Sequence, residues 1–170
     1  MIGTVAPVKQ GWIGIVRSAV GFCRVTLLQT SFSSALALLG DNLQVLPHND
    51  PAFGSLPERL RRYFEGEPVA FPDELDLDSA SSFRQAVWQA TRSIPFGETR
   101  SYRWVAEQIG KPKAARAVGQ ALAANPLAIV IPCHRVIGSG GGLCGFGGGL
   151  EMKRWLLELE SSASKFRSGE

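Results

Sequence analysis

The apolar positions in the first third of the chain fall into short runs that are rich in β-branched and aromatic residues. Residues 12–16 and 22–28 are two such runs, and residues 18–21 supply a turn between them, so a β-hairpin is predicted. A short helix is expected over residues 33–39. Residues 41–54 contain two prolines together with Asn and Asp residues, which indicates a loop.

A second helix is expected after Ser55, because Ser55 and Glu58 have the spacing of a capping box. Apolar residues then recur at helical spacing until Gly66, which predicts the end of the helix. The acidic, proline-containing stretch 68–79 follows. It is predicted to link a small N-terminal domain, residues 1–78, to a second domain, residues 79–170.

The pattern of the second domain is helical. Ser82 begins a capping box, and the helix after it has an apolar face formed by Phe83, Ala86, Val87, Ala90 and Ile94. Two short helices, one capped by Ser101 and one over residues 114–124, are joined by a turn at residues 110–113, which predicts a helix-turn-helix. A last helix is expected over residues 150–160. The predicted class is α+β: an N-terminal antiparallel β-sheet with helix, followed by a mostly helical domain.

Composition narrows the class of protein. Of the residues, 45% are hydrophobic and 19% are charged, as in globular proteins, and no apolar run is long enough to span a membrane. Residues 1–10 have neither the basic nor the apolar region of a signal peptide. Three widely spaced cysteines do not form a disulfide framework and favour a reducing, cytoplasmic compartment. With two histidines and no Cys-x-x-Cys pair, no bound metal is expected.

Charge is unevenly distributed although the net charge is only +3. Residues 65–78 contain acidic but no basic side chains, whereas residues 99–150 contain six basic side chains and one acid. A local basic excess is what a surface that binds a polyanion requires. A solvated face without a partner would show the same pattern.

Cys133 and His134 are the candidate reactive pair. They lie between an apolar run, residues 127–131, and a segment in which glycine fills eight of the twelve positions from 138 to 149. A neighbouring imidazole or cation favours the thiolate, which is the nucleophilic form of cysteine. A small thiol buried in the core is the alternative interpretation.

The second helix of the predicted helix-turn-helix has an unusually small outer face. Ala115, Val118 and Leu122 are expected to face the core, and the opposite side carries Arg116, Gly119, Gln120 and Ala123. Reading of bases in the major groove normally uses several long polar side chains. The face instead suits close approach to a DNA backbone or a minor groove, with Arg116 as its one long cationic side chain. A packed pair of helices is the alternative.

Glu160 falls at the edge of the apolar stripe of the last helix, whose members are Met152, Trp155, Leu156 and Leu159. A carboxylate at a core boundary usually has a partner, and His134 is the available imidazole. Hydrogen bonding to Glu160 would then fix the tautomer of His134. An acid at a frayed helix end is the alternative.

These stretches together resemble the O6-alkylguanine-DNA alkyltransferases, also called methylated-DNA–protein-cysteine methyltransferases. The resemblance is dense from residue 83 to residue 160. The matching segments are residues 94–99, 101–102, 113–119, 125–126, 131–136 and 148–150, followed by Lys153 and residues 155–157. It implies a winged-helix-like second domain and direct reversal of damage in DNA, without a cofactor. The expected partner is double-stranded DNA that contains O6-alkylguanine or O4-methylthymine, bound in the minor groove independently of sequence by a monomer away from membranes.

The resemblance also implies roles for individual residues. Cys133 would accept the alkyl group as a stable thioether, so each molecule would act once. His134, through a water, would take the thiol proton, and Glu160 would orient His134. Tyr102 would donate to the guanine ring, and Asn125 would brace the segment before Cys133. The residues expected to contact DNA are Tyr102, Ala115, Arg116, Gly119, Gln120, Ala123 and Arg135, with Arg116 entering the duplex.

The base pocket is expected to be formed by Pro132, Val136, Phe146 and Gly147. Phe146 stands where the family commonly has Tyr, and Gly147 where some members have Ser, so two hydroxyl groups are missing. Cys144 is a second thiol in the same glycine-rich segment. Residues that bind metal in the N-terminal domain of some members are not matched.

Three other functions fit parts of the pattern. A non-enzymatic sensor of alkylated bases would lack the acceptor cysteine, which is present here. A helix-turn-helix transcription factor would need a face with more long polar side chains. A cysteine hydrolase would use the same thiol and imidazole but would turn over repeatedly.

Overall fold

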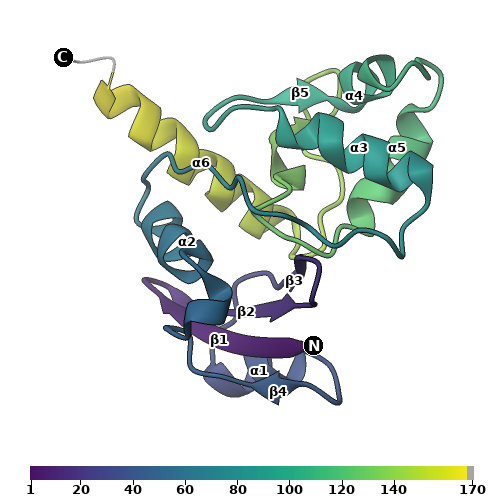
Figure 1. Cartoon of the computed structure of the whole chain (residues 1–170). Helices are drawn as coiled ribbons and strands as arrows, with labels where there is room; N and C mark the ends of the chain where they lie inside the picture. The colour runs from purple at the N-terminus through teal and green to yellow at the C-terminus, as the bar shows by residue number, and fades with distance from the viewer. Residues whose placement is uncertain (168–170) are drawn as a thin grey trace. The chain divides into compact units, whose positions relative to one another are not determined.

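The structure is a computed structural model that describes residues 1–167, and the chain divides into two compact units (Figure 1). The first unit contains Met1–Leu77 and the short segment Pro126–Ala128. The second contains Asp78–Asn125 and the chain from Ile129 onward. Within the described residues, no helix combines the length and the apolar character that a bilayer span requires.

The first unit is built on a four-stranded sheet in the order β3-β2-β1-β4. The strands are β1 (Ile2–Val8), β2 (Gly11–Arg17), β3 (Phe22–Val25) and β4 (Gln44–Val45). The hairpin expected over residues 12–28 is confirmed as the antiparallel pair β2–β3. Strand β1 was not expected, because Gly3 and Pro7 weaken the strand pattern. Pro7 is tolerated there because β4 pairs with β1 only at Ile2 and Gly3, so the far side of Pro7 carries no ladder.

Helices cover both faces of this sheet (Figure 1). On one face, α1 (Phe32–Ala37) packs Ala35 and the following Leu39 against Val5 and Val16. On the other lies α2 (Leu56–Phe64), whose Leu60, Tyr63 and Phe64 are buried. The predicted loop over residues 41–54 contains β4 and a 3-10 turn, Pro51–Phe53.

The helix ends in this unit only partly follow the sequence signals. Ser31 caps α1 by accepting a hydrogen bond from the Ser34 N–H. The capping box expected at Ser55 is wrong, since its side chain makes no capping hydrogen bond. Gly66 ends α2 as expected and has φ 89°, a conformation that suits glycine.

The second unit is mostly helical. It contains α3 (Ser82–Arg92), α4 (Tyr102–Gln108), α5 (Ala115–Ala123) and α6 (Leu150–Arg167), with a 3-10 turn at Cys133–Arg135. Two short parallel strands, β5 (Arg100–Ser101) and β6 (Val136–Ile137), pair with each other. Helices α4 and α5 form the expected helix-turn-helix, with Gly110 at φ 72° in the turn. The predicted α+β class is therefore confirmed.

Four details of these helices differ from the sequence pattern. Helix α3 is capped by Ser81 rather than Ser82. Trp88 was left out of the predicted apolar face of α3. It is buried, and its Nε1 donates to the Ala121 carbonyl at 2.9 Å. Ala86, which was included in that face, is exposed. Helix α6 continues past Glu160 to Arg167. The Trp88 hydrogen bond shows that the buried face of α3 is turned toward α5.

Candidate active site

A single 3-10 turn presents Cys133, and residues 129–132 before it are buried. The Cys133 N–H donates to the Ile131 carbonyl at 2.8 Å, and the Arg135 N–H donates to the Pro132 carbonyl at 2.9 Å. Ile129 has φ 70°, which is rare for a β-branched residue and carries backbone strain. The thiol is therefore held on a tight turn that the surrounding chain fixes.

Asn125 braces this turn, in the position that the resemblance implied. Its side-chain Nδ2 donates to the Ile131 carbonyl at 2.9 Å and to the Cys133 sulfur at 3.3 Å. Burial raises the pKa of the Cys133 thiol, and the Asn125 hydrogen bond and the charge of Lys153 offset this only in part. The resting protein at neutral pH therefore holds a thiol, and attack requires a base.

His134, Glu160 and Arg135 form one buried cluster. His134 Nε2 lies 2.6 Å from Glu160 Oε1, and Arg135 contacts the same carboxylate through Nε at 3.0 Å. The Gly97 N–H donates to Glu160 Oε2 at 3.0 Å. This carboxylate therefore receives hydrogen bonds from two separate segments of the second unit, the 3-10 turn and the chain at Gly97.

The protonation states in this cluster follow from burial and pairing. Burial alone would raise the pKa of Glu160, but hydrogen bonds from His134 and Arg135 outweigh it and lower the pKa to about 2. Burial lowers the pKa of His134, against the opposing effect of Glu160. A carboxylate cannot donate, so Nε2 carries the proton of a neutral His134 and Nδ1 carries the lone pair. The arrangement gives the imidazole one nitrogen that can act as a base.

Two predictions about this cluster need correction. Glu160 does not lie at the edge of the apolar stripe of α6 but at its buried centre, on the same side as Lys153 and Leu156. Arg135 is not on a DNA-facing surface: it is 6% exposed, and its second guanidinium nitrogen donates to the Ile94 carbonyl at 2.8 Å. Its charge is used inside the protein.

The structure adds a residue that had no predicted role. Lys153 on α6 is 1% exposed, and its ammonium donates to the carbonyl of Val136 at 2.7 Å and to that of Cys144 at 3.2 Å. Tyr102 Oη lies 3.5 Å from the same ammonium. Lys153 lies on the same face of α6 as Leu156 and Glu160, which was expected to be apolar. A lysine at such a position was the sequence feature that could have indicated a role.

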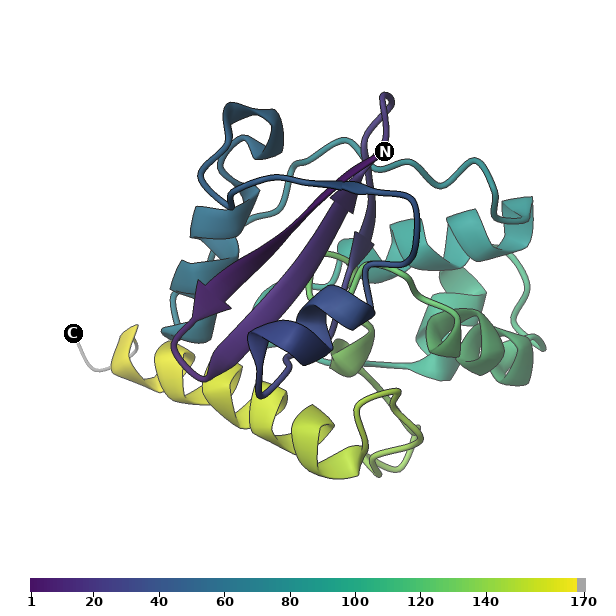
Figure 2. The ribbon, with the colours of Figure 1, turned by 90° about the horizontal axis from the view of Figure 1, so that it is seen from below.

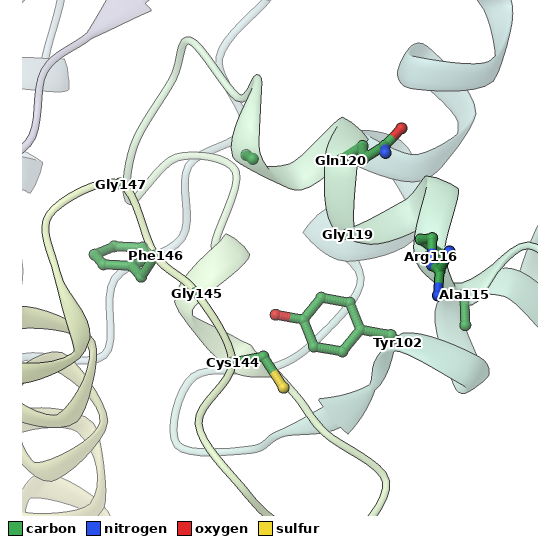
Figure 3. A pocket seen from close by; sticks show the side chains of 10 residues that line it. Tyr102, Ala115, Arg116, Gly119, Gln120, Cys144, Gly145, Phe146 and Gly147 are labelled. Atoms are coloured by element: carbon green, nitrogen blue, oxygen red, sulfur yellow. The ribbon is translucent and has the colours of Figure 1, made fainter.

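A pocket of about 670 Å³ lies between the helix-turn-helix and the segment 138–149, called here the glycine loop (Figure 3). The glycine loop joins β6 to α6 and bends on itself through a hydrogen bond from the Gly138 N–H to the Gly142 carbonyl (Figure 2). Figure 3 shows the ring of Tyr102 between α5 and this loop, with its hydroxyl group directed toward the loop. Burial raises the pKa of Tyr102, which keeps it a hydroxyl donor.

Most residues predicted for DNA and base binding meet at this pocket. Its lining residues are Tyr102, Ala115, Arg116, Gly119, Gln120, Ala123, Cys144, Gly145, Phe146 and Gly147. Ala115, expected in the core from its spacing, is half-buried and lies at the pocket, as the resemblance implied. Pro132 and Val136 are buried and do not line it, and the Val136 carbonyl is taken by Lys153. Cys144 is exposed and lines the pocket, whereas the sequence indicated only that it is a second thiol.

Known proteins have sequences similar to that of this chain. The family profile described as "6-O-methylguanine DNA methyltransferase, DNA binding domain" matches residues 82–162. A methylated-DNA–protein-cysteine methyltransferase of Mycobacterium tuberculosis is 56% identical over 114 residues, which cover 66% of this chain and 68% of that protein. One from Haemophilus influenzae is 47% identical over 110 residues, covering 65% of this chain and 62% of that protein.

Solved structures agree over nearly the whole chain. The crystal structure of Mycobacterium tuberculosis O6-methylguanine methyltransferase has a TM-score of 0.78 at 40% identity and covers 95% of this chain and 93% of that chain. The Mycobacterium tuberculosis protein in complex with DNA has a TM-score of 0.79 at 40% identity, covering 96% of this chain and 94% of that chain. The chain belongs to the family of the methylated-DNA–protein-cysteine methyltransferases, enzymes that repair O6-alkylguanine in DNA.

Proposed function

We propose that this protein transfers the alkyl group from O6 of guanine in double-stranded DNA to the sulfur of Cys133. The observation that carries the proposal is the thiol on its braced turn, followed directly in the sequence by a neutral imidazole that a buried carboxylate orients. In the reaction the sulfur–carbon bond forms as the carbon–O6 bond breaks. The electron pair moves to O6 and the guanine ring, and the product is a thioether.

The protonation states of His134 and Tyr102 support a role for each of them. His134 takes the thiol proton through a water, because its Nε2 proton is held by Glu160 and its other nitrogen can accept. Tyr102 donates its hydroxyl proton to the leaving base as charge develops there, which lowers the barrier for loss of guanine. A thioether is a stable product, and no group that could regenerate the thiol is proposed, so each molecule acts once.

DNA binding through the minor groove fits the face of α5. Gly119, Gln120 and Ala123 line the pocket together with the longer Arg116. Small side chains permit close approach without reading base sequence, which suits lesions that arise anywhere. The alkylated nucleotide must leave the stack, at a cost of a few kcal/mol, and Arg116 fills the space that it vacates.

The remaining parts of the proposal follow from the same chemistry. O4-methylthymine presents an equivalent alkyl–oxygen bond and is included as a substrate. The protein acts as a monomer, needs no cofactor and no metal, and works in the cytoplasm, where a reducing environment keeps Cys23, Cys133 and Cys144 as free thiols.

The test is the intact mass of the protein after incubation with a duplex that contains one O6-methylguanine, followed by peptide mapping. We expect one methyl group per molecule, on Cys133, and no further addition with excess duplex. Cys133→Ala should give no adduct, whereas Cys23→Ala, in the sheet of the first unit, should react like the wild type. A methyl group on Cys23 or Cys144, or repeated turnover, would contradict the proposal, and lesion binding without an adduct would favour a damage sensor.

A further inference from the structure

Two of the three cysteines lie in the same region of the second unit. Cys133 is half-buried on the 3-10 turn, and Cys144 is exposed at the pocket. Val136 directly follows that turn, and its carbonyl and the carbonyl of Cys144 both accept hydrogen bonds from the Lys153 ammonium, at 2.7 Å and 3.2 Å. The glycine loop therefore folds back, so that the chain at Cys144 lies beside the chain that leaves the turn of Cys133.

The position of the Cys144 sulfur agrees with this arrangement. A Cβ added to Gly138, the first residue after β6, would lie 3.2 Å from that sulfur. Figure 3 shows Cys144 beside the ring of Tyr102. Burial raises the pKa of Tyr102, and the charges of Cys144 and Cys133 raise it further. Burial lowers the pKa of Lys153, and the same two thiolates oppose this effect. The two sulfurs therefore have two polar neighbours in common.

The chain around Cys144 can change shape at low cost. A Cβ at any of residues 140–142 or at Gly145 would meet nothing within 4 Å, and glycine adopts backbone conformations that are closed to other residues. Cys133, in contrast, is fixed on its turn by Asn125. A disulfide requires the two Cα atoms to lie within about 7 Å of each other. An adaptable loop that carries one thiol past a fixed second thiol can meet this requirement.

We propose that Cys144 is the partner of Cys133 in a reversible disulfide, which forms under oxidation by peroxides and blocks the alkyl acceptor. The thiolate of the exposed Cys144 attacks one oxygen of hydrogen peroxide, which gives a sulfenic acid and releases hydroxide. The Cys133 thiolate then attacks the Cys144 sulfur, and the sulfur–oxygen bond breaks as a second hydroxide leaves. The two hydroxides take up the two thiol protons as water. The thiol pair is oxidised by two electrons, and the peroxide is reduced.

The disulfide would preserve the acceptor during oxidative conditions. Sulfinic and sulfonic acids of cysteine form irreversibly, whereas a disulfide is reversed by thiols. A protein that can use its acceptor sulfur only once loses its whole activity when that sulfur is oxidised irreversibly. The effect on alkyl transfer rests on the proposed function, but formation of the disulfide does not.

Peptide mapping after treatment with hydrogen peroxide tests the proposal. Remaining thiols are blocked with iodoacetamide, and the tryptic peptides are mapped without reduction. Trypsin cleaves after Arg135, which stands between the two cysteines, so the disulfide would join peptides 117–135 and 136–153. We expect the joined peptides in the wild type and in Cys23→Ala, the control in the first unit, but not in Cys144→Ser. The intact mass should fall by that of two hydrogen atoms, without dimers.

Alkyl transfer to an O6-methylguanine duplex gives the second readout, with each protein compared with its own untreated sample. Wild-type activity should fall in proportion to the linked fraction and return after dithiothreitol. The same peroxide treatment should leave the rate of Cys144→Ser unchanged, because the half-buried Cys133 is oxidised only through Cys144. Melting temperatures check that this variant folds, and Cys144→Ala replaces it if it does not.

Three results would overturn the proposal: a sulfinic acid at Cys133 without joined peptides, a disulfide between two molecules, or an equal loss of rate in Cys144→Ser. An untreated wild type that transfers no alkyl group would instead overturn the proposed function. In that case the peptide map would still test the disulfide.

Discussion

The two sides of the active site are built on opposite principles. On the side of the nucleophile, Glu160 and His134 are fully buried and are fixed by short hydrogen bonds within the second unit. On the side proposed to bind DNA, Arg116, Gln120 and Ala123 of α5 are exposed and line an open pocket. The buried side sets protonation states through charge in a low dielectric. The open side has small side chains and one exposed cation, Arg116, as the proposed sequence-independent approach to DNA requires.

Among the variants that test this contrast, Glu160→Gln is expected to have the largest effect. The change leaves Arg135 buried without its counter-charge, and loss of one partner of a buried ion pair typically costs about 3–5 kcal/mol. The alkyl-transfer rate should fall with it, since His134 loses its orienting carboxylate. Denaturant unfolding measures the first effect and intact mass the second.

Glu158→Gln is the matched control, because Glu158 is exposed on the same helix. It should change the unfolding free energy by no more than about 0.5 kcal/mol. Similar losses in the two variants would show that the buried carboxylate has no special part.

Lowering the pH should remove the same contribution of Glu160 to the unfolding free energy without a mutation. The pKa of Glu160 is lowered to about 2, so its stabilising effect is present above the ordinary carboxyl pKa and is lost as the pH falls toward 2. The difference from an ordinary value near 4.3 corresponds to about 3 kcal/mol. The pKa of His134 is also lowered, so the unfolded chain binds its proton first, and stability begins to fall below about pH 6.5.

Unfolding midpoints measured between pH 7 and pH 3 test this sign. The wild type should lose stability continuously over that range. Glu160→Gln should show a shallower dependence, because it lacks the main titrating carboxylate. Equal slopes for the two proteins would contradict the assigned pKa of Glu160.

Arg116→Ala should affect only the open side. We expect the rate with an O6-methylguanine duplex to fall by about tenfold, as for loss of an inserted side chain that offsets base flipping. The rate with free O6-benzylguanine should stay within about twofold, since no nucleotide has to leave a stack. Arg154→Ala removes an exposed cation that does not line the pocket, and it is the control. Equal losses with both substrates would remove Arg116 from the flipping step.

The smallest effect is expected from Gly119→Ala. A Cβ at this position would lie 3.7 Å from Tyr102 Cε1, an ordinary contact, so the helix should gain up to about 1 kcal/mol from the better helix former. The reaction with duplex DNA should nevertheless slow, because the face of α5 becomes bulkier. Ala123→Gly, the reverse change on the same face, should lower the melting temperature. A Gly119→Ala protein that is more stable and equally fast on duplex would show that close approach is not needed here.

Local signals explain what the sequence predicted well. The β2–β3 hairpin, the cap at Ser101 and the turn at Gly110 each depend on a few neighbouring residues. The motif around Cys133 identified the candidate reactive residues. Helical spacing placed Arg116, Gly119 and Gln120 on the outer face of α5, but it assigned Ala115 to the core. Strand β1 was missed because its pairing partners, and not its own composition, make it a strand.

The environments of the buried charged residues could not be predicted from their neighbours in the sequence. A glutamate or lysine on an apolar stripe is unfavourable in isolation, so Glu160 was placed at the edge and Lys153 was given no role. Their partners come from segments far away in the sequence, such as Gly97 for Glu160 and Val136 for Lys153. Arg135 was assigned to DNA for the same reason, since nothing near it in the sequence shows that Glu160 takes up its charge.

The glycine loop has a consequence for the entropy of substrate binding. Eight of its twelve residues are glycine, which lose more conformational freedom on ordering than any other residue. The bond from Lys153 to the Cys144 carbonyl divides the loop into two shorter spans, and the Gly149 N–H bond to the Phe146 carbonyl restricts the second of them. Part of the ordering cost is therefore met when the chain folds. If the pocket takes a flipped base as proposed, a larger share of the binding free energy remains to stabilise the transition state.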